Sequence, residues 1–377
     1  MPPFVIDVRA ADDARDVVHR AVQALVEGKL VAFPTETVYG LAARALDVRA
    51  VGRLLAVKGR KKGHPVSLAV RSLDEALDYT PDMSPLARRL ARRCWPGPIT
   101  LVLDDSHPES LVRRLPEEVR QAVSPQGTIG LRVPGHAVIL DVLQLIAGPL
   151  ALSSANRGGE RDATTGKEVV ETLRDDVDLV LDDGPTRYGQ PSSVVHVAGR
   201  ECRILRVGVV PERTIRRLSS YMVLFVCTGN TCRSPMAEVL FRKILADRLT
   251  CRLDELEERG VIVLSAGVSA MSGGRASSEA VHVLAEMGLD LSQHETQPLN
   301  DSLVRQADAI FTMTQSHRHA ILAQWPDAAA RTHTLGPSGE DIVDPIGGPL
   351  DRYLRCARQI GGHLERRIDE IIGEIQG

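Results

Sequence analysis

The sequence predicts an α/β protein of two domains. A chain of 377 residues is long for one hydrophobic core and of ordinary length for two. Hydrophobic residues make up 43% of the chain and aromatic residues only 3%, so the cores must be aliphatic, as in Val- and Leu-rich α/β sheets. Short apolar strands also alternate with amphipathic helices. We expect one domain over residues 1–211 and another over residues 221–377, with a short arginine-containing linker near 211–221.

The first domain is predicted to open with a helix and a buried strand. Apolar residues recur with helical spacing over residues 11–27, and Gly28 supplies a stop. Residues 30–33 indicate a buried strand that leads into a Pro-Thr-Glu-Thr loop. Further on, residues 84–93 favour a helix with arginines four apart. Such a face could meet RNA phosphates, but an arginine cluster of this kind is more often a solvated surface.

A strand, a tight loop and a helix start follow one another at residues 223–238. The apolar strand ends at Cys227, Arg233 follows, and Ser234 is a good N-cap before a proline. Backbone N–H groups at a helix N-terminus collect dianions and stabilise a thiolate. Arg233 can hold two phosphate oxygens, and the Ser234 hydroxyl can donate to the sulfur when it leaves. The pattern predicts cleavage of a phosphate ester or phosphoramidate by a cysteine. The alternative is a buried strand-end thiol beside a surface arginine.

The remaining elements of the second domain complete the prediction. A helix with an apolar face follows the loop, residues 308–313 indicate a strand, and residues 354–375 a closing amphipathic helix. A phosphate-binding loop between a strand and a helix, among alternating β and α elements, implies a doubly wound parallel sheet. Two weaker patterns are expected to be structural. Residues 265–267 should form a turn, and His317 and His319 should lie at the start of a surface helix.

Residues 223–235 resemble the phosphate loop of the low-molecular-weight protein-tyrosine phosphatases, and the resemblance extends from Met222 to about Gly377. It implies catalytic roles for Cys227, Arg233 and Ser234. It also implies a general acid on a distant Asp-Pro loop, where Asp344 would protonate the leaving atom and then activate water against a phosphocysteine. Asp-Pro is also ordinary turn chemistry. The implied phosphate loop is completed by Thr228, Gly229, Asn230, Thr231 and Cys232.

Two features of this half bear on the substrate. Thr231, together with the Asp-Pro-x-Gly-Gly acid loop, resembles the protein-arginine phosphatase branch, although branch members often have Phe where Ile346 stands. Tyrosine enzymes usually place aromatic residues beside the acid. We therefore expect phosphoarginine in a phosphoprotein, in preference to phosphotyrosine. Cys232 would either trap an oxidised Cys227 as a disulfide or be a small packed side chain.

Six short motifs of the first half occupy residues 33–41, 58–60, 95–100, 131–134, 153–156 and 204–206. In this order and spacing they resemble the YrdC/Sua5 family, the threonylcarbamoyl-AMP synthases of tRNA modification. The resemblance covers about residues 5–210 and implies a twisted, mixed α/β sheet with a concave nucleotide cleft. The family often has Asn where His64 stands and His where Ala69 stands.

The chemistry of that reaction fits these residue types. Making a carbamoyl adenylate from L-threonine, bicarbonate and ATP gathers several anions in one cavity, so it needs fixed cations and many donors rather than a nucleophile. The resemblance places Thr37 and Arg132 at threonine, with Ser192 nearby. Asn156 is a further donor, and Lys58 belongs to the Lys-x-Arg pair expected at the triphosphate. The remaining ATP-facing residues are Arg60, Thr128, Ser154 and Arg206.

Composition limits the partners. The net charge is −3, so no acidic or basic tail dictates binding. We expect no signal peptide and no membrane span. We also expect a reducing cytoplasm, because the six cysteines are scattered without framework or zinc spacing.

ATP is expected as a substrate with Mg²⁺, without a redox cofactor or protein-bound metal. Expected partners are tRNA or tRNA-modification proteins and a phosphoprotein. The competing hypothesis is an RNA-binding YrdC-like module joined to a regulatory tyrosine phosphatase.

Overall fold

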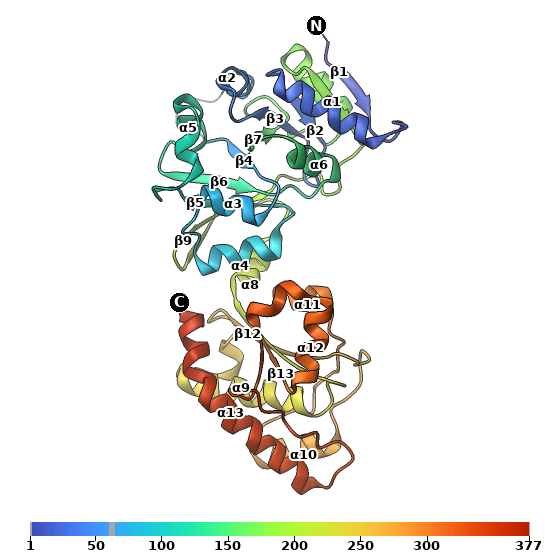
Figure 1. The fold of residues 1–377 in the computed structure, drawn as a ribbon, viewed down its shortest axis with the longest axis vertical. Helices are drawn as coiled ribbons and strands as arrows, with labels where there is room; N and C mark the ends of the chain where they lie inside the picture. The colour runs from blue at the N-terminus through green and yellow to red at the C-terminus, as the bar shows by residue number, and fades with distance from the viewer. Residues whose placement is uncertain (1, 60–64, 377) are drawn as a thin grey trace. The chain divides into compact units, whose positions relative to one another are not determined.

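The chain folds into two compact units, Met1–Ile215 and Arg216–Gly377, each with its own sheet (Figure 1). The computed structural model describes residues 2–59 and 65–376. The predicted α/β class is confirmed in both units. The segment expected to be a linker differs from the prediction, because Glu212–Ser219 forms helix α8. Pro211 precedes its first turn, and most of its residues are good helix formers.

The first unit is built on a mixed sheet. In the described residues its strand order is β1-β8-β2-β3-β7-β4-β6-β5-β9-β10. Parallel pairs such as β4 with β6 alternate with antiparallel pairs such as β3 with β7. The sheet therefore is mixed, as the family resemblance implied. Its strands are β1 (Phe4–Asp7), β2 (Val31–Phe33), β3 (Gly40–Arg44), β4 (Ser67–Ala69), β5 (Ile99–Asp104), β6 (Thr128–Arg132), β7 (Leu150–Ser154), β8 (Leu179–Asp182), β9 (Ser193–Ala198) and β10 (Glu201–Arg206).

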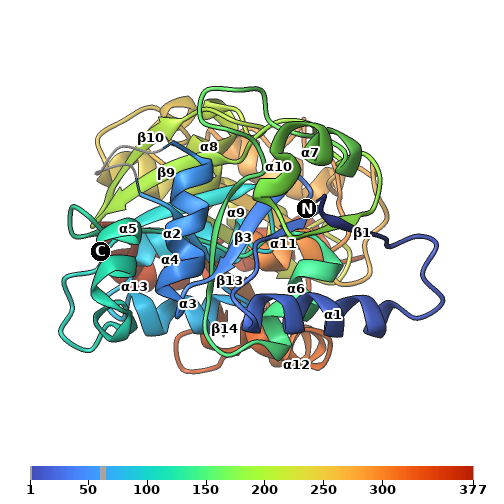
Figure 2. The same ribbon diagram turned by 90° about the horizontal axis from the view of Figure 1, so that it is seen from above.

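Helices cover this sheet with apolar stripes. Figures 1 and 2 show α1 and α6 side by side, and their buried faces share one aliphatic core with β2 and β8. The arginine-rich helix α4 buries Leu86 and Leu90, while Arg88 is exposed. The helices are α1 (Ala14–Val26), α2 (Val48–Val57), α3 (Leu73–Tyr79), α4 (Pro85–Cys94), α5 (Glu117–Val123), α6 (Ala137–Leu145) and α7 (Gly166–Leu173).

The second unit holds a parallel sheet with the described strand order β12-β11-β13-β14. Alternate residues of β11 face opposite cores: Val223 and Phe225 pack in one cluster, Leu224 and Val226 in the other. A parallel sheet covered on both faces requires this continuous apolar strand. The predicted doubly wound sheet is thus confirmed. Its strands are β11 (Tyr221–Cys227), β12 (Val261–Gly267), β13 (Ala309–Thr312) and β14 (Thr332–Thr334).

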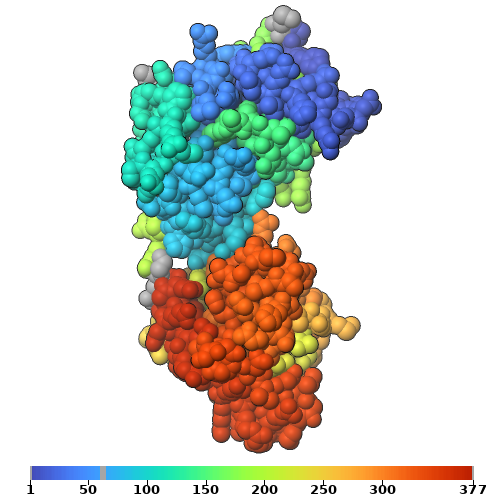
Figure 3. Space-filling model, viewed as in Figure 1, coloured from blue at the N-terminus to red at the C-terminus, as the bar shows by residue number. Residues whose placement is uncertain are grey.

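Two helical layers enclose the parallel sheet. One core is shared by α9, α10 and α13, and the other by α11 and α12. The C-terminal part of this unit, orange to red, covers the face shown in Figure 3. The predicted closing helix is present as α13. The helices are α9 (Arg233–Arg248), α10 (Ser278–Glu286), α11 (Asp301–Gln306), α12 (Gln315–Gln324) and α13 (Leu350–Gln376).

Candidate active sites

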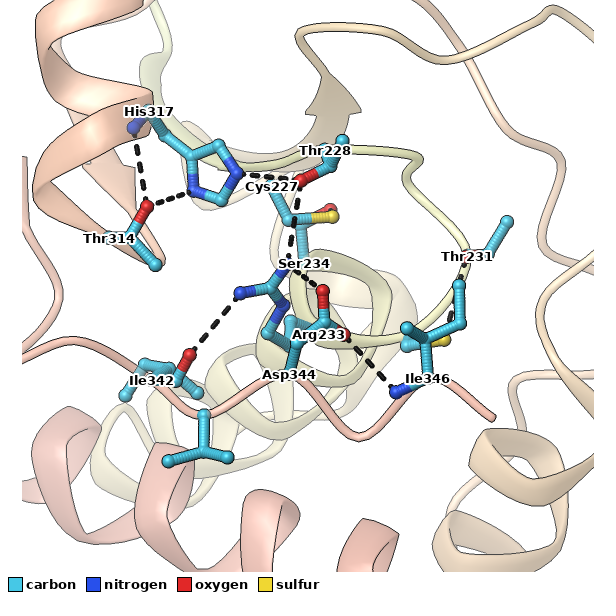
Figure 4. A network of polar contacts seen from close by, with 12 residues as sticks. Cys227, Thr228, Thr231, Arg233, Ser234, Thr314, His317, Ile342, Asp344 and Ile346 are labelled. Carbon is cyan, nitrogen blue, oxygen red and sulfur yellow. Dashed lines mark hydrogen bonds and ion pairs between the residues drawn. The ribbon is translucent and has the colours of Figure 1, made fainter. Parts of the chain in front are cut away.

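Cys227 is the last residue of the central strand β11, and α9 begins six residues later at Arg233. The Cys227 sulfur is buried, with 3% of the residue exposed. It lies 3.0 Å from Ser234 Oγ and accepts from the Asn230 backbone N–H at 3.3 Å (Figure 4). A hydroxyl and a backbone donor thus converge on one sulfur, an arrangement that stabilises negative charge there.

Asn230 holds the turn of the loop. Its φ of 56° lies in the left-handed region, which Asn tolerates better than most residues. The Asn230 side-chain amide donates to Ser234 Oγ at 3.0 Å and to Ser265 Oγ at 2.9 Å. Ser265 was expected in a turn, but it lies in strand β12 and donates to Glu238 at 2.7 Å. Burial raises the pKa of Glu238. Ser265 therefore supports the loop from the neighbouring strand.

Arg233 and Asp344 meet at the mouth of the loop. The Arg233 guanidinium is 5% exposed and lies 2.5 Å from Asp344 Oδ2, while its other nitrogen donates to the Ile342 carbonyl at 3.2 Å. The Asp344 carboxylate is 40% exposed and also accepts from the Ile346 backbone N–H. Figure 4 shows both side chains beside Cys227. The structure thus brings together the cysteine, arginine and aspartate selected from the sequence.

His317 differs from the sequence prediction. The expected helix is present, but His317 is buried and lies beside the phosphate loop, whereas His319 is exposed. The His317 Nε2 atom lies 2.9 Å from Thr228 Oγ1, and Nδ1 lies 2.9 Å from Thr314 Oγ1 (Figure 4). Burial, and then the charge of Arg233, lowers the pKa of His317 to about 4. The ring is therefore neutral at pH 7.

The other side of the loop is packed against α10 and α13. Thr231 Oγ1 lies 3.5 Å from the Cys232 sulfur. The buried Cys232 sulfur lies 3.3 Å from Ser277 Oγ and 3.6 Å from the Tyr353 hydroxyl. Neither Cys227 nor Cys232 is in a disulfide, and a redox role for Cys232 stays a prediction. Gly229 has room for a Cβ, whose nearest neighbour would be Thr231 Oγ1 at 3.6 Å.

The first unit contains a cavity of about 380 Å³. It opens among β3, β4, β5, β6, β7 and the ends of β9 and β10. Hydroxyl groups and guanidinium groups dominate its polar lining. The predicted residues that line it are Thr128, Arg132, Ser154, Ser192 and Arg206. The sequence prediction missed the lining side chains Ser67, Thr100 and Gln126, although Thr100 belongs to one of the six motifs.

Arg132 is fixed by a buried ion pair. Its NH2 atom lies 2.6 Å from Glu36 Oε1 and donates to Thr37 Oγ1 at 2.9 Å. Glu36 also accepts from the Gly135 backbone N–H at 2.7 Å. The sequence prediction missed Glu36, although it stands beside Thr37 in the Pro-Thr-Glu-Thr motif. Thr37 does not itself line the cavity, but its hydroxyl contacts Arg132, which does.

Lys58 holds the loop that follows β7. Its Nζ donates to the Ser154 carbonyl at 2.8 Å and to the Asn156 carbonyl and side-chain oxygen, each at 2.6 Å. Ser154 Oγ also lies 3.3 Å from the Lys58 Nζ. Lys58 and Asn156 therefore support Ser154 from behind the cavity. Arg60 and His64 lie outside the described residues, and Ala69 is the last residue of β4.

Arg206 and Ser192 line the cavity together. The Arg206 guanidinium donates to the Ser192 carbonyl at 2.8 Å and to Ser192 Oγ at 3.1 Å. Thr100 Oγ1 lies 3.1 Å from the same hydroxyl. Burial lowers the pKa of Arg206 from its very high ordinary value. A second cationic group thus faces the cavity beside two hydroxyls.

Comparisons with known proteins match each unit separately. The family model described as Telomere recombination, which covers Sua5, YciO and YrdC proteins, matches residues 23–208. The model described as Low molecular weight phosphotyrosine protein phosphatase matches residues 222–375.

Among residues 2–59 and 65–376, no helix is long and apolar enough to cross a bilayer.

Individual relatives agree with these matches. The threonylcarbamoyl-AMP synthase of Pyrococcus abyssi is 32% identical over 243 residues, which are 61% of this chain and 69% of the relative. The protein-arginine-phosphatase of Geobacillus stearothermophilus is 39% identical over 161 residues, 41% of this chain and 97% of the relative. A solved structure of a double variant of P. abyssi Sua5 is 25% identical with a TM-score of 0.52, covering 71% of this chain and 92% of that one.

The chain therefore belongs to the Sua5/YrdC family in its first half and to the low-molecular-weight phosphatase family in its second. Its relatives in these families include proteins named threonylcarbamoyl-AMP synthase and protein-arginine-phosphatase.

Proposed function

We propose that the chain is a bifunctional enzyme whose second domain hydrolyses phosphoarginine in proteins through a phosphocysteine. The observation that carries this proposal is the contact of the Cys227 sulfur with Ser234 Oγ at 3.0 Å, beside the Arg233–Asp344 pair. A nucleophile, a dianion-binding cation and a proton donor thus occupy one site.

The reaction follows from those positions. The Cys227 sulfur attacks phosphorus and forms a P–S bond while the P–N bond to the leaving guanidino group breaks. Asp344 gives its proton to that nitrogen. Water then attacks phosphorus, its proton goes to Asp344, and the sulfur leaves as a thiolate that accepts from the Ser234 hydroxyl. Arg233 holds two phosphoryl oxygens through both steps.

Thr231 supports phosphoarginine as the substrate. It precedes Cys232 on the loop, and the acid loop continues with Gly347 and Gly348. Ile346 is a departure from the arginine-phosphatase branch and does not add to this support. Phosphotyrosine is the second candidate. Its flat ring would be expected to need aromatic neighbours beside Asp344.

The test is phosphate release from a phosphoarginine peptide and a phosphotyrosine peptide of the same sequence, with Cys227→Ser as the control. Faster release from phosphoarginine supports the proposal. Faster release from phosphotyrosine assigns the domain to tyrosine phosphatases. Release that persists in Cys227→Ser contradicts the phosphocysteine route.

For the first domain, we propose formation of threonylcarbamoyl-AMP from L-threonine, bicarbonate and ATP, for the modification of tRNA. The supporting observation is the cavity, which Arg132 and Arg206 line together with several hydroxyl groups. Two fixed cations suit a carboxylate and a phosphate chain in one space. Thr37 and Arg132 would hold threonine, with Ser192 nearby, and Thr128, Ser154 and Arg206 would face ATP.

Magnesium is expected with ATP. Among the described residues that line the cavity, hydroxyl, amide and guanidinium groups are present and a carboxylate is not. The lining therefore does not offer the oxygen anions that Mg²⁺ prefers.

The test is pyrophosphate release that depends on both threonine and bicarbonate, with Arg206→Gln as the control. Release that requires both substrates supports a synthase. Tight tRNA binding without any such release supports the competing hypothesis of an RNA-binding module.

A further inference from the structure

His317 is a buried, nitrogen-bearing ring that the proposed phosphatase mechanism does not use. It lies on α12, outside the phosphate loop, yet its Nε2 atom is 2.9 Å from the Thr228 hydroxyl. Thr228 follows the nucleophile directly in the chain. Its oxygen also lies 3.5 Å from Arg233 NH2, so the ring is connected to the phosphate-binding cation through one hydroxyl (Figure 4).

The contacts of Thr314 favour one assignment of the His317 ring proton. Thr314 is the N-cap of α12 and its Oγ1 accepts from the His317 backbone N–H at 3.3 Å. The Thr314 proton is then available for His317 Nδ1, which lies 2.9 Å away. A neutral ring that accepts at Nδ1 carries its proton on Nε2 and donates to Thr228.

This arrangement orients the Thr228 hydroxyl. A hydroxyl oxygen has two lone pairs and one proton. With the proton on Nε2, His317 donates to that oxygen. Arg233 also approaches it as a donor, because a guanidinium has no acceptor. The proton of Thr228 is therefore left for a further acceptor on the side where Arg233 would hold a phosphoryl group.

We propose that His317 is a positioning residue of the phosphatase site, which donates to Thr228 so that the Thr228 hydroxyl donates to a phosphoryl oxygen of the substrate. This inference rests on the proposed phosphatase function. In the opposite tautomer Thr228 would donate to the ring, and its proton would not reach the substrate.

The first experiment reads the tautomer directly. Nitrogen-15 spectra of the full chain near neutral pH are recorded for the wild type and for His317→Gln, which identifies the His317 signals among those of the eleven histidines. A proton on Nε2 supports the proposal. A proton on Nδ1 overturns it, whether or not the enzyme turns over.

The second experiment measures kcat/KM for para-nitrophenyl phosphate. We expect His317→Phe and Thr228→Val each to lower it about tenfold, the size of one hydrogen bond to a charged group. Because both act through the same proton, the double variant should be no slower than either single one. His317→Gln, whose amide donates, should recover part of the loss seen in His317→Phe, and Thr228→Ser, which keeps the hydroxyl, should recover part of the loss seen in Thr228→Val. His319→Gln, on the exposed side of the same helix, is the matched control.

Other outcomes distinguish failure of the role proposed for His317 from failure of the proposed phosphatase function. A lower melting temperature with kcat/KM unchanged in His317→Phe, or losses that multiply in the double variant, would show a purely structural role. If the wild type shows no release that depends on Cys227, the proposed function fails. Orthovanadate affinity then decides the inference: about tenfold weaker binding in Thr228→Val and His317→Phe supports it, and equal binding overturns it.

Discussion

Glu36 and Arg132 form a buried ion pair, with Oε1 and NH2 2.6 Å apart and less than a tenth of either side chain exposed. The pair joins the loop after β2 to the end of β6. Glu36 also accepts from Gly135, so its carboxylate fixes both the guanidinium and the backbone that follows it. The cation proposed to hold threonine is therefore set by a carboxylate outside the cavity lining.

Replacing Glu36 tests this pair. Glu36→Ala should lower the free energy of unfolding by about 3 kcal/mol, because it leaves Arg132 buried without its charge partner. Glu36→Gln keeps the shape and should mainly raise the KM for threonine, by roughly tenfold. Urea unfolding and threonine-dependent pyrophosphate release check the two effects. Glu117→Gln, at an exposed pair, is the control, and an unchanged KM in Glu36→Gln would contradict the role assigned to the pair.

Replacing the proposed general acid should depend on the leaving group. Asp344→Asn cannot protonate the leaving atom, so kcat should fall about a hundredfold or more for poor leaving groups and less for good ones. A series of aryl phosphates of increasing leaving-group pKa measures this dependence. An equal fall across the series would instead indicate that Asp344 acts by holding Arg233, 2.5 Å away.

The Ser234 hydroxyl should stabilise the Cys227 thiolate when it leaves phosphorus in the second step. Ser234→Ala removes the hydroxyl 3.0 Å from the Cys227 sulfur and should slow breakdown of the phosphocysteine about tenfold. Rapid-mixing experiments would then show a burst of the leaving group followed by slow turnover. Ser316→Ala, on an exposed part of α12, should behave as wild type. A slower burst phase with unchanged turnover would place Ser234 in the first step instead.

His317 should make the free energy of unfolding depend on pH. The pKa of His317 is about 4 in the folded protein, against an ordinary value of 6.5. Burial and then the charge of Arg233 lower this pKa, and the charges of Asp344 and Asp341 partly offset the lowering. Between these values the unfolded chain binds a proton that the folded chain does not. The free energy of unfolding should therefore fall as the pH drops from about 6.5 to about 4 and then level off.

His317→Gln isolates that contribution. Urea unfolding of the wild type and the variant near pH 7 and near pH 5 should show a smaller acid-induced loss in the variant. The comparison is needed because the raised pKa of Glu238 contributes with the opposite sign. Parallel losses in the two proteins would contradict the lowered pKa of His317.

Local patterns explain what the sequence could predict. The strand, loop and helix start around Cys227 lie within a short segment, so the apolar run, the loop and the Ser-Pro pair identify one another there. The predicted N-cap was wrong in detail, because α9 begins at Arg233 with Cys232 as its N-cap, and the Ser234 hydroxyl contacts the Cys227 sulfur instead. The Asp344 loop required the family resemblance, because 111 residues separate it from Arg233.

The missed contacts are long-range. Thr228 and His317 lie 89 residues apart, and Glu36 and Arg132 lie 96 apart. A polar residue in a motif does not say which distant partner satisfies it when both are buried. Helix α8 was missed because it has few apolar residues among its arginines, too few to show a helical spacing. One of these apolar residues, Ile215, is buried.

The central strand β11 ends in Cys227, and its residues are shared between two hydrophobic clusters on opposite faces of the sheet. Backbone hydrogen bonds tie Val226 and Cys227 to Met313 and Val268, the residues just beyond the two neighbouring strands. Amide hydrogens in such a position exchange with solvent through opening of the whole cooperative unit rather than through local fraying. The base of the phosphate loop therefore shares the lifetime of the domain, and hydrogen exchange of the Val268 and Met313 amides would time its global unfolding.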